Sequence, residues 1–489
     1  MNLNWQPDLS FPLFHAKMDV NQINASLLNN VLTSDTSGLM NYFYHDTLIR
    51  FQLDTIVEIP DTTLIDTSYF VPGPMAPGVN FLNSEDKVEL KLKDAKLKKV
   101  LVQQGEIEVQ LTNTLPEMVL FDIQIPSAIF NSDTFMVQEQ IPANSSIVKS
   151  YDLSGYEFNL KDMQTEQYNT FTIKYSATSN PDGNVIPNGF YSVNAKVNMQ
   201  NFQLSYAEGY FGQSSFTMSE KYAVNLVPNV LSGSVLFDEA TLQLEVQNYL
   251  GVEIQHHLNQ LKFGKDGAEV LFNDIEQQLN TTFNRANFWN GQVYPVTRTF
   301  MFTGQNSNIN DLIGLFPEEI DISSLFQINP LGNISNYSDF VFTDQGFLLI
   351  ADAQVPLRFN TNNLIFSDTL DLSFQFDSLI LNEKYAGTID LHVINTFPSD
   401  IDLKVYFLDE NQLVVDSLFS DFQSFPYNTN LTVYRNLTEV SNTRFQNWQN
   451  TVRFVKVEAR LNSPDFKTLT NTDYIFVKPV VHLTYEAHI

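Results

Sequence analysis

The chain has 489 residues, no cysteine, and 56 Asp and Glu against 27 Lys and Arg, which gives a formal net charge of −29. Its length allows two to four domains, each able to bury its own core. The missing cysteine excludes disulfides, zinc–cysteine sites, iron–sulfur clusters and thiol catalysis, and the negative charge argues against nucleic acid as a partner.

The first residues lack the features of an export signal. Residues 1–7 (MNLNWQP) have neither a basic nor an apolar region. Taken literally this predicts a cytoplasmic protein, but a chain that begins after a removed signal peptide would look the same. No run approaches the roughly 18–20 apolar residues that a helix needs to cross a bilayer.

In chain order, most segments predict β-strands and few predict helices. A short helix is predicted at 19–31, and a better one at 273–289, where apolar residues recur at steps of four, four and three. Between and after them, apolar residues alternate with polar ones, as at 106–111, and Pro- and Gly-containing turns separate these runs. The chain is therefore predicted to be all-β with a few short helices.

An internal repeat is the most informative feature. Residues 105–116 (GEIEVQLTNTLP) match 387–398 (GTIDLHVINTFP), and three further matches follow in the same order. A partial copy lies at 242–251. We therefore predict tandem related β-sandwich-like units at 1–225 and 296–489, joined by a central segment at 226–295 that holds the partial copy and a short helix.

The repeated Asn and Pro have a structural explanation. After a strand with one buried face, Asn can bond to its own backbone and Pro ends the ladder by lacking an N–H group. Such a motif lets a chain cross from one sheet of a sandwich to the other. We favour this structural role over ligand contact for Asn113, Asn248 and Asn395.

Motifs of catalysis and metal binding are missing. The sequence has no nucleophile elbow, phosphate-binding loop, zinc-protease motif or EF-hand. Adjacent His256 and His257 would point to opposite faces of a strand, and we expect a surface or edge role for them. Acidic pairs near 318–321 and 400–402 could hold Ca²⁺, but solvated charge is the better reading. We predict no enzyme activity and no catalytic, cofactor-binding or metal-binding residue.

The three tryptophans, Trp5, Trp289 and Trp448, are too few to predict a carbohydrate platform and are expected in the core.

Six triplets of Asp, then Ser or Thr, then an apolar residue or Thr resemble the O-glycosylation acceptor motif of Bacteroidota envelope proteins. Ordinary strand composition produces the same triplets, so this stays an alternative. The acceptor positions would be Thr47, Thr55, Thr62, Thr369, Ser378 and Ser417.

The start at 5–13, the Asn-Thr-(Leu/Phe)-Pro strands and residues 406–411 together resemble uncharacterised cell-envelope lipoproteins of Bacteroidota. The resemblance implies a domain on the outer-membrane surface or in the periplasm, held to the membrane only through an N-terminal lipid anchor that this sequence does not contain.

Three functions then compete. The first is a non-enzymatic interaction or assembly module with envelope or outer-membrane protein partners. The second is a carrier of lipid or another hydrophobic ligand, resembling tubular lipid-binding proteins, and the third is a glycan-binding protein.

Overall fold

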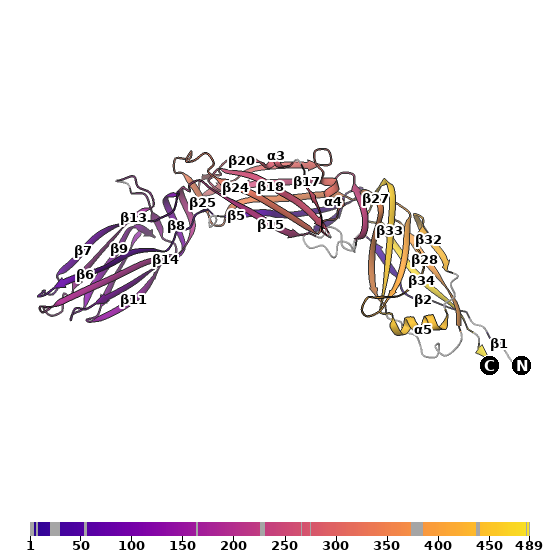
Figure 1. The fold of residues 1–489 in the computed structure, drawn as a ribbon, viewed down its shortest axis with the longest axis horizontal. Coiled ribbons are helices and arrows are strands. Elements are labelled where there is room, and N and C mark those ends of the chain that lie inside the picture. Colours follow the sequence, from indigo (N-terminus) through magenta and orange to yellow (C-terminus); the bar gives the residue numbers. More distant parts are fainter. Residues whose placement is uncertain are drawn as a thin grey trace.

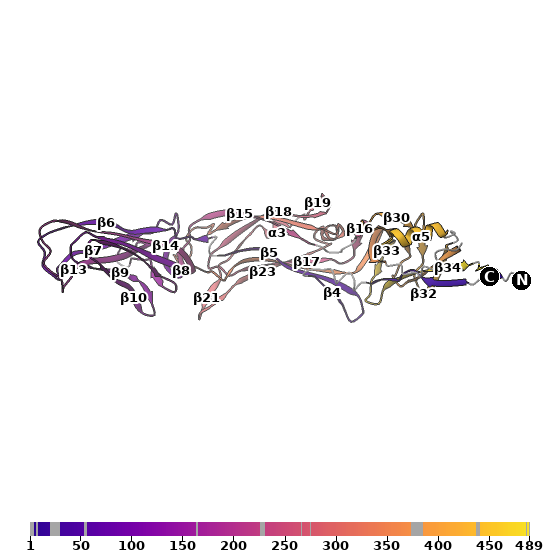
Figure 2. The same cartoon turned by 90° about the horizontal axis from the view of Figure 1, so that it is seen from below.

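The computed structural model describes residues 4–5, 8–19, 30–52, 56–162, 165–224, 230–265, 267–273, 275–372, 385–436, 441–485 and 487–488. The prediction of an all-β chain with minor helix is confirmed. Three β-sandwiches follow one another in an elongated arch, and both chain ends lie at the same end of it (Figure 1). There, β1 (Asn4–Trp5) pairs with β35 (Ala487–His488). Figure 2 shows the same row of sandwiches turned by 90°.

The sandwich farthest from the chain ends, the distal unit, is formed by one continuous stretch of chain. Its longest strands, β8 and β14, pair with each other over most of their length. The distal strands are β6 (Thr62–Pro72), β7 (Asn80–Glu89), β8 (Lys96–Asn113), β9 (Val119–Phe130), β10 (Asp133–Ile141), β11 (Ser145–Asp152), β12 (Glu157–Asn159), β13 (Thr170–Ser179) and β14 (Phe190–Tyr210).

The central sandwich, the middle unit, combines strands from before and after the distal unit. Its main strands are β4 (Asn30–Ser34), β5 (Met40–Gln52), β15 (Ser214–Ala223), β17 (Thr241–Asn248), β18 (Ile254–Lys265), β23 (Val296–Thr303), β24 (Glu319–Ile328) and β26 (Gly346–Pro356). Shorter elements complete it: β19 (Ala268–Leu271), α3 (Glu276–Leu279), β20 (Thr281–Phe283), β21 (Asn287–Trp289), β22 (Gln292–Tyr294), α4 (Ile309–Gly314) and β25 (Asp339–Phe342).

The sandwich next to the chain ends, the terminal unit, also combines early and late segments. It contains β2 (Asp8–Pro12), β3 (Ala16–Asp19), β16 (Val230–Phe237), β27 (Arg358–Asp371), β28 (Tyr385–Asn395), β29 (Ile401–Leu408), β30 (Val414–Ser417), β31 (Gln423–Phe425), β32 (Asn428–Asn436), α5 (Asn442–Thr451), β33 (Phe454–Thr468) and β34 (Tyr474–Tyr485).

The three units are nested along the chain. Strand β5 pairs with β26, about 300 residues later, and β2 and β3 pair with β34. The distal unit is therefore inserted in the middle unit, and the middle unit in the terminal one, with one exception: β16, which lies between β15 and β17 in the sequence, joins a sheet of the terminal unit. The sheets cross the boundaries predicted at 225/226 and 295/296, because each outer unit is completed only after the chain returns from the inner one.

All three units share one order of strand pairing. A strand with an Asn at its end (β8, β17 or β28) pairs with the last strand of its unit (β14, β26 or β34). In the facing sheet the next strand (β9, β18 or β29) pairs with β13, β24 or β33. Buried residues alternate with more exposed ones along these strands, so each core lies between two sheets.

Each unit has one buried Asn at the same place, namely Asn113, Asn248 and Asn395. Each side-chain carbonyl accepts from the backbone N–H two residues later, at 2.8, 3.0 and 3.1 Å. Each side-chain amide donates to the carbonyl four residues later, at 2.9, 3.1 and 2.9 Å. It also donates to a returning segment, at the carbonyls of Ile141, Asn284 and Phe425, at 3.1, 2.8 and 3.2 Å.

These contacts form a buried Asn turn, which is the role in chain geometry predicted from the sequence. The residue after each Asn donates its N–H to the segment that begins the last strand, at the carbonyls of Ser192, Gly346 and Tyr474, 3.0 Å in each case. The partial copy at 242–251 thus makes the same turn as the two fuller copies. Duplication of one module, as the origin of this likeness, stays a prediction.

The predicted helices are mostly wrong where they can be compared. Among the described residues of 273–289, which leave out 274, only Glu276–Leu279 is helical, and the rest includes β20 and β21. Paired strands on both sides limit the helix to one turn. Of 19–31, residues 20–29 lie outside the described residues, while Asp19 ends β3 and Asn30 begins β4. Helix α5, which Ser441 caps by accepting from the N–H of Arg444 at 3.2 Å, was not predicted.

Replacing Asn248 with Ala should destabilise the protein by roughly 2–4 kcal/mol, because the N–H of Leu250 and two buried carbonyls lose their partner. Chemical denaturation measures the change. Asn83→Ala, at an exposed position of β7, is the control and should change stability by no more than about 0.5 kcal/mol. Equal losses of stability from the two substitutions would contradict a stabilising role for the buried Asn turn.

Candidate functional site

The acidic pairs considered for Ca²⁺ have basic partners. Lys221 Nζ lies 2.7 Å from Glu319 Oε1 and 3.6 Å from Asp321 Oδ2, and Lys265 Nζ lies 4.0 Å from Glu318 Oε1. Because lysine already balances these carboxylates, they do not present the free oxygen ligands that Ca²⁺ requires.

The second acidic pair is also engaged. Arg460 donates to Asp402 Oδ2 at 2.7 Å and 3.0 Å, and Asp400 Oδ1 accepts from the backbone N–H of Tyr427 at 2.9 Å. Within the described part of the chain, no group of three or more His, Asp or Glu side chains is placed to hold a metal ion.

The adjacent histidines point to opposite faces as predicted, but His256 does not lie on the surface. It is fully buried against Phe326, with Nδ1 3.0 Å from the carbonyl of Leu279 and Nε2 2.9 Å from Ser324 Oγ. Burial lowers the pKa of His256 to about 4. The ring is therefore a neutral core group with both nitrogens satisfied, and the surface role is wrong because β18 is an interior strand of its sheet. His257 is partly exposed.

A row of Ser, His and Asp lies on the outer sheet of the terminal unit. Ser10 Oγ is 2.7 Å from His482 Nδ1, and His482 Nε2 is 3.2 Å from the buried Asp390 Oδ2. This order of atoms resembles a hydrolase triad, but all three residues lie within paired strands of one sheet, and none lies in a loop or at a helix start that would gather N–H groups around an oxyanion. We assign the row a structural role.

The predicted glycosylation positions are spread over the molecule. Thr47 and Thr62 are partly buried in β5 and β6, Thr369 is exposed in β27, and Ser417 is partly buried in β30. Thr55 and Ser378 lie outside the described residues. Their modification stays a prediction.

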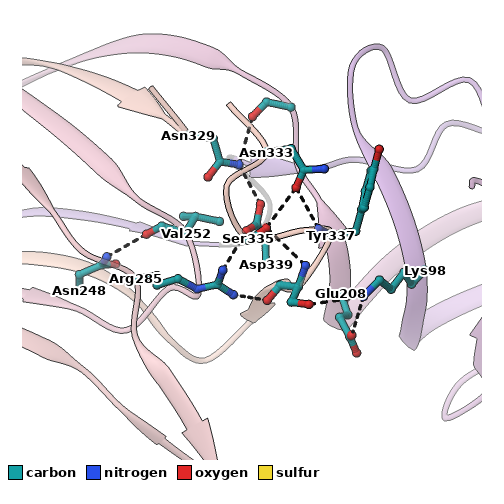
Figure 3. Close-up of polar contacts among 12 residues, drawn as sticks. Lys98, Glu208, Asn248, Val252, Arg285, Asn329, Asn333, Ser335, Tyr337 and Asp339 are labelled. Carbon is teal, nitrogen blue, oxygen red and sulfur yellow. Dashed lines mark hydrogen bonds and ion pairs between the residues drawn. The ribbon is translucent and has the colours of Figure 1, made fainter. Parts of the chain in front are cut away.

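A buried polar network joins the middle and distal units (Figure 3). Strand β25 of the middle unit pairs through 339–342 with 206–209 of β14. Asp339, at its start, is fully buried and accepts from Asn329 Nδ2 at 2.8 Å, while Arg285 Nη1 lies 3.6 Å from its other oxygen. Burial raises the pKa of Asp339.

Contacts from the same loop extend onto the distal unit. Tyr337 stacks on Tyr168 with 4.3 Å between ring centroids, and Ser338 Oγ accepts from Lys98 Nζ at 3.5 Å. Within the distal unit, Lys98 Nζ also lies 3.6 Å from Glu208 Oε1 (Figure 3). Because Arg285 already sits beside Asp339, the network does not call for a bound cation. It is a structural junction, and no local sequence pattern indicated it.

The middle unit encloses a small cavity between its sheets. The cavity has a volume of about 40 Å³ and an apolar lining that includes Leu48, Leu261, Ile309 and Ile320. Pockets for small-molecule ligands usually measure about 300–1,000 Å³. This cavity is too small for the acyl chain of a lipid.

An aromatic hairpin projects beside the junction. Strands β21 and β22 pair Asn287 with Tyr294 and Trp289 with Gln292, so these four side chains share one face. Trp289 is 75% exposed, whereas Phe288 on the other face lies 5.6 Å from Phe340 between ring centroids. Trp448 is buried as expected and the side chain of Trp5 is not described, but the core prediction is wrong for Trp289.

Exposed aromatic residues also occur at the free end of the distal unit, which we call the distal tip (the loops 73–79, 114–118, 142–144 and 180–189 with the strand ends beside them). Phe190 is 96% exposed and Phe70 75% exposed. Phe190 is opposite Pro72 and Phe70 is opposite Ser192, so both rings lie on one face of the β6–β14 pair. Val185, 62% exposed, lies in the neighbouring loop.

The distal tip is almost free of charge in a strongly acidic chain. No charged residue occurs at 67–84 or at 183–195. The tip loops contain two charged residues, Glu117 and Asp182. Glu117 accepts from Asn184 Nδ2 at 2.8 Å and from its backbone N–H at 3.1 Å. These uncharged runs were visible in the sequence, but their meeting at one end of the molecule was not.

No family model and no curated protein matches the chain. Among solved structures it is similar to a "putative secreted protein" of Parabacteroides distasonis, with 12% identity, a TM-score of 0.31, and coverage of 54% of this chain and 82% of that one. It is also similar to a structure of Broad Bean Stain Virus, with 13% identity, a TM-score of 0.19, and coverage of 61% and 90%. Likenesses this weak carry no argument about the function.

No helix among the described residues is both long and apolar enough to cross a membrane.

Removing the buried histidine should change how stability depends on pH. The unfolded-state pKa is about 6.5 and the folded one about 4, so the unfolded chain binds the proton first as the pH falls. The stability of the wild type relative to His256→Gln should fall by about 3 kcal/mol between pH 7 and pH 4. Urea denaturation at each pH measures this difference, and a constant difference would show that His256 is protonated without cost.

Proposed function

We propose that this protein is a non-enzymatic interaction protein of the bacterial cell envelope, a rod of three sandwiches that presents its distal tip to a protein partner. The observation that carries the proposal is that the chain ends and the distal tip lie at opposite ends of the molecule. The paired segments β1 and β35 lie at one end, and the charge-poor, aromatic tip lies at the other (Figure 1).

The chemistry of the tip supports docking of a protein. The cores of protein interfaces are poor in charged residues and rich in aromatic ones, and a few large side chains supply most of the binding energy. Phe70 and Phe190 fit this description. In water, two phenylalanines at these exposures gain little from folding, whereas covering them would contribute on the order of 1.5–3 kcal/mol each.

An envelope location is proposed from the sequence. The resemblance to Bacteroidota envelope lipoproteins implies a protein of the outer-membrane surface or periplasm, with a lipid anchor as its membrane attachment. The Asp-(Ser/Thr) triplets accord with export. Fractionation of a Bacteroidota strain that expresses the full gene tests this part, and recovery in the cytoplasm would contradict it.

Substituting both tip phenylalanines should abolish partner capture. Immobilised wild-type protein is expected to retain a stoichiometric partner from an envelope extract, either a copy of this chain or another protein. The double variant Phe70→Ser, Phe190→Ser should lose it. Leu413→Ser, at a 65% exposed position of the terminal unit, is the control and should retain it. No stoichiometric partner, or equal capture by all three proteins, would refute docking through the tip.

Glycan binding is a second candidate, favoured by the hairpin face that combines Trp289 and Tyr294 with Asn287 and Gln292. Aromatic rings can stack on the apolar faces of sugars while amides bond to their hydroxyls. The cavity in the middle unit does not support a lipid carrier, because about 40 Å³ cannot hold an acyl chain.

If the hairpin binds glycans, Trp289→Ala should reduce the signal on a glycan array at least tenfold, because the ring is the largest exposed surface of that face. Met301→Ala, 49% exposed on the neighbouring β23, should leave the signal unchanged. An array without signal for the wild type would eliminate this candidate.

A further inference from the structure

In the terminal unit, the end that carries the buried Asn turn is covered by the middle unit. The segment just before β34 makes this contact through its backbone. Thr470 bridges Leu39, and the N–H of Met40 donates to the carbonyl of Leu469 at 3.1 Å. The N–H of Leu469 in turn donates to the carbonyl of Leu357 at 2.9 Å.

In the middle unit, the corresponding end is covered by the distal unit. Here too the contact is made by the segment just before the last strand. Residues 339–342 pair with 206–209, and the N–H of Thr343 donates to the carbonyl of Ser205 at 3.1 Å. Two successive units therefore use the same stretch, three to seven residues before the start of the last strand, to bind the next sandwich.

In the distal unit the same end has no further sandwich against it. By the shared backbone bond at Ser192, the equivalent stretch is 185–189. It bonds only within its own unit among the described residues, where Ile186 and Met75 exchange backbone hydrogen bonds at 2.8 and 3.0 Å. The exposed Val185 and Phe190 stand at its two sides. The distal tip is thus equivalent to the sandwich ends that are covered in the terminal and middle units, but no sandwich of the same chain covers it.

We propose that the distal tip binds the distal tip of a second copy of this chain. Both covered ends in the series are covered by sandwiches of this same chain, which makes such a sandwich the fitting occupant. The opposite end of a second copy carries the paired chain ends β1 and β35, which the proposed anchor would hold at the membrane. The second copy's own tip, with the same charge-poor and aromatic surface, is therefore the end that we assign to the contact.

Electrostatic repulsion favours the tip-to-tip contact over an arrangement in which the two chains lie side by side. Two chains of net charge −29 repel each other along their sides. Contact between the two tips, whose loops contain only Glu117 and Asp182 as charged residues, keeps most other acidic groups farther apart than the Debye length, about 8 Å at physiological ionic strength.

The inference rests on the proposed role of the tip as a docking surface, and it names the partner. A tip-to-tip dimer places the two pairs of chain ends at opposite ends of a rod of twice the length. Anchored through those ends, it would connect two surfaces or two assemblies.

Analytical ultracentrifugation of the purified full chain tests the proposal. The wild type should show a concentration-dependent monomer–dimer equilibrium. The double variant Phe70→Ser, Phe190→Ser should weaken it on the order of 100-fold, as expected when two interface anchors are lost. Leu413→Ser should dimerise like the wild type. Unchanged circular dichroism and melting would show that the exposed substitutions leave the fold intact.

Small-angle scattering of the dimer should give about twice the maximum dimension of the monomer. A wild type that stays monomeric, a dimer that survives the double substitution, or a dimer no longer than one chain would each overturn the proposal. If the wild type is monomeric yet captures a different envelope protein through Phe70 and Phe190, the second copy is excluded while the docking function stands. If the double substitution changes neither dimerisation nor partner capture, the tip-to-tip dimer and the docking function of the tip are both contradicted.

Discussion

The pairing of β5 with β26 is the constraint on which the architecture depends. It joins a strand made before the distal unit to one made after it, with Gly346 opposite Gln52 and Pro356 opposite Asn41. The middle sandwich has no complete sheet until the chain has gone out and returned, and the pairing of β2 and β3 with β34 repeats this one level further out. Nesting thereby places both chain ends at one end of the arch and a single uninterrupted unit at the other.

The ends of the sandwiches then determine what the molecule presents. A buried Asn turn shapes the same end of each unit, and the segment before the last strand reaches from that end to the next sandwich. The junction between the middle and distal units adds a buried carboxylate, Asp339, that is held by Asn329 and Arg285. In the distal unit the series stops, and aromatic side chains face solvent where an adjoining unit would lie. We infer that recognition takes place there, away from the polar interior groups that initially resemble active-site residues.

Much of the fold class and the turns could be predicted from the sequence, because alternation of apolar residues and the Asn-Pro signature are local. The nested topology could not, since nothing in residues 40–52 indicates a partner at 346–356. Two local rules failed for a related reason. The helical periodicity at 273–289 and the surface assignment of His256 were overridden by strand pairing and by the depth of β18 in the sheet. The sequence shows the two runs without charge that form the distal tip, but only the fold reveals that Phe70 and Phe190 lie together.

Cysteine cross-linking tests the nested pairing most directly, because these 489 residues include no cysteine to interfere. His45 and Asp352 are directly opposite each other across β5 and β26; His45 is exposed and Asp352 is partly exposed. The variant His45→Cys, Asp352→Cys should form a disulfide under mild oxidation, seen as a linked peptide pair by mass spectrometry. The variant His45→Cys, Asn83→Cys, with both positions in the first half of the chain, should not. The nested architecture would be contradicted if the first variant formed no disulfide, or if the second variant formed one and the first did not.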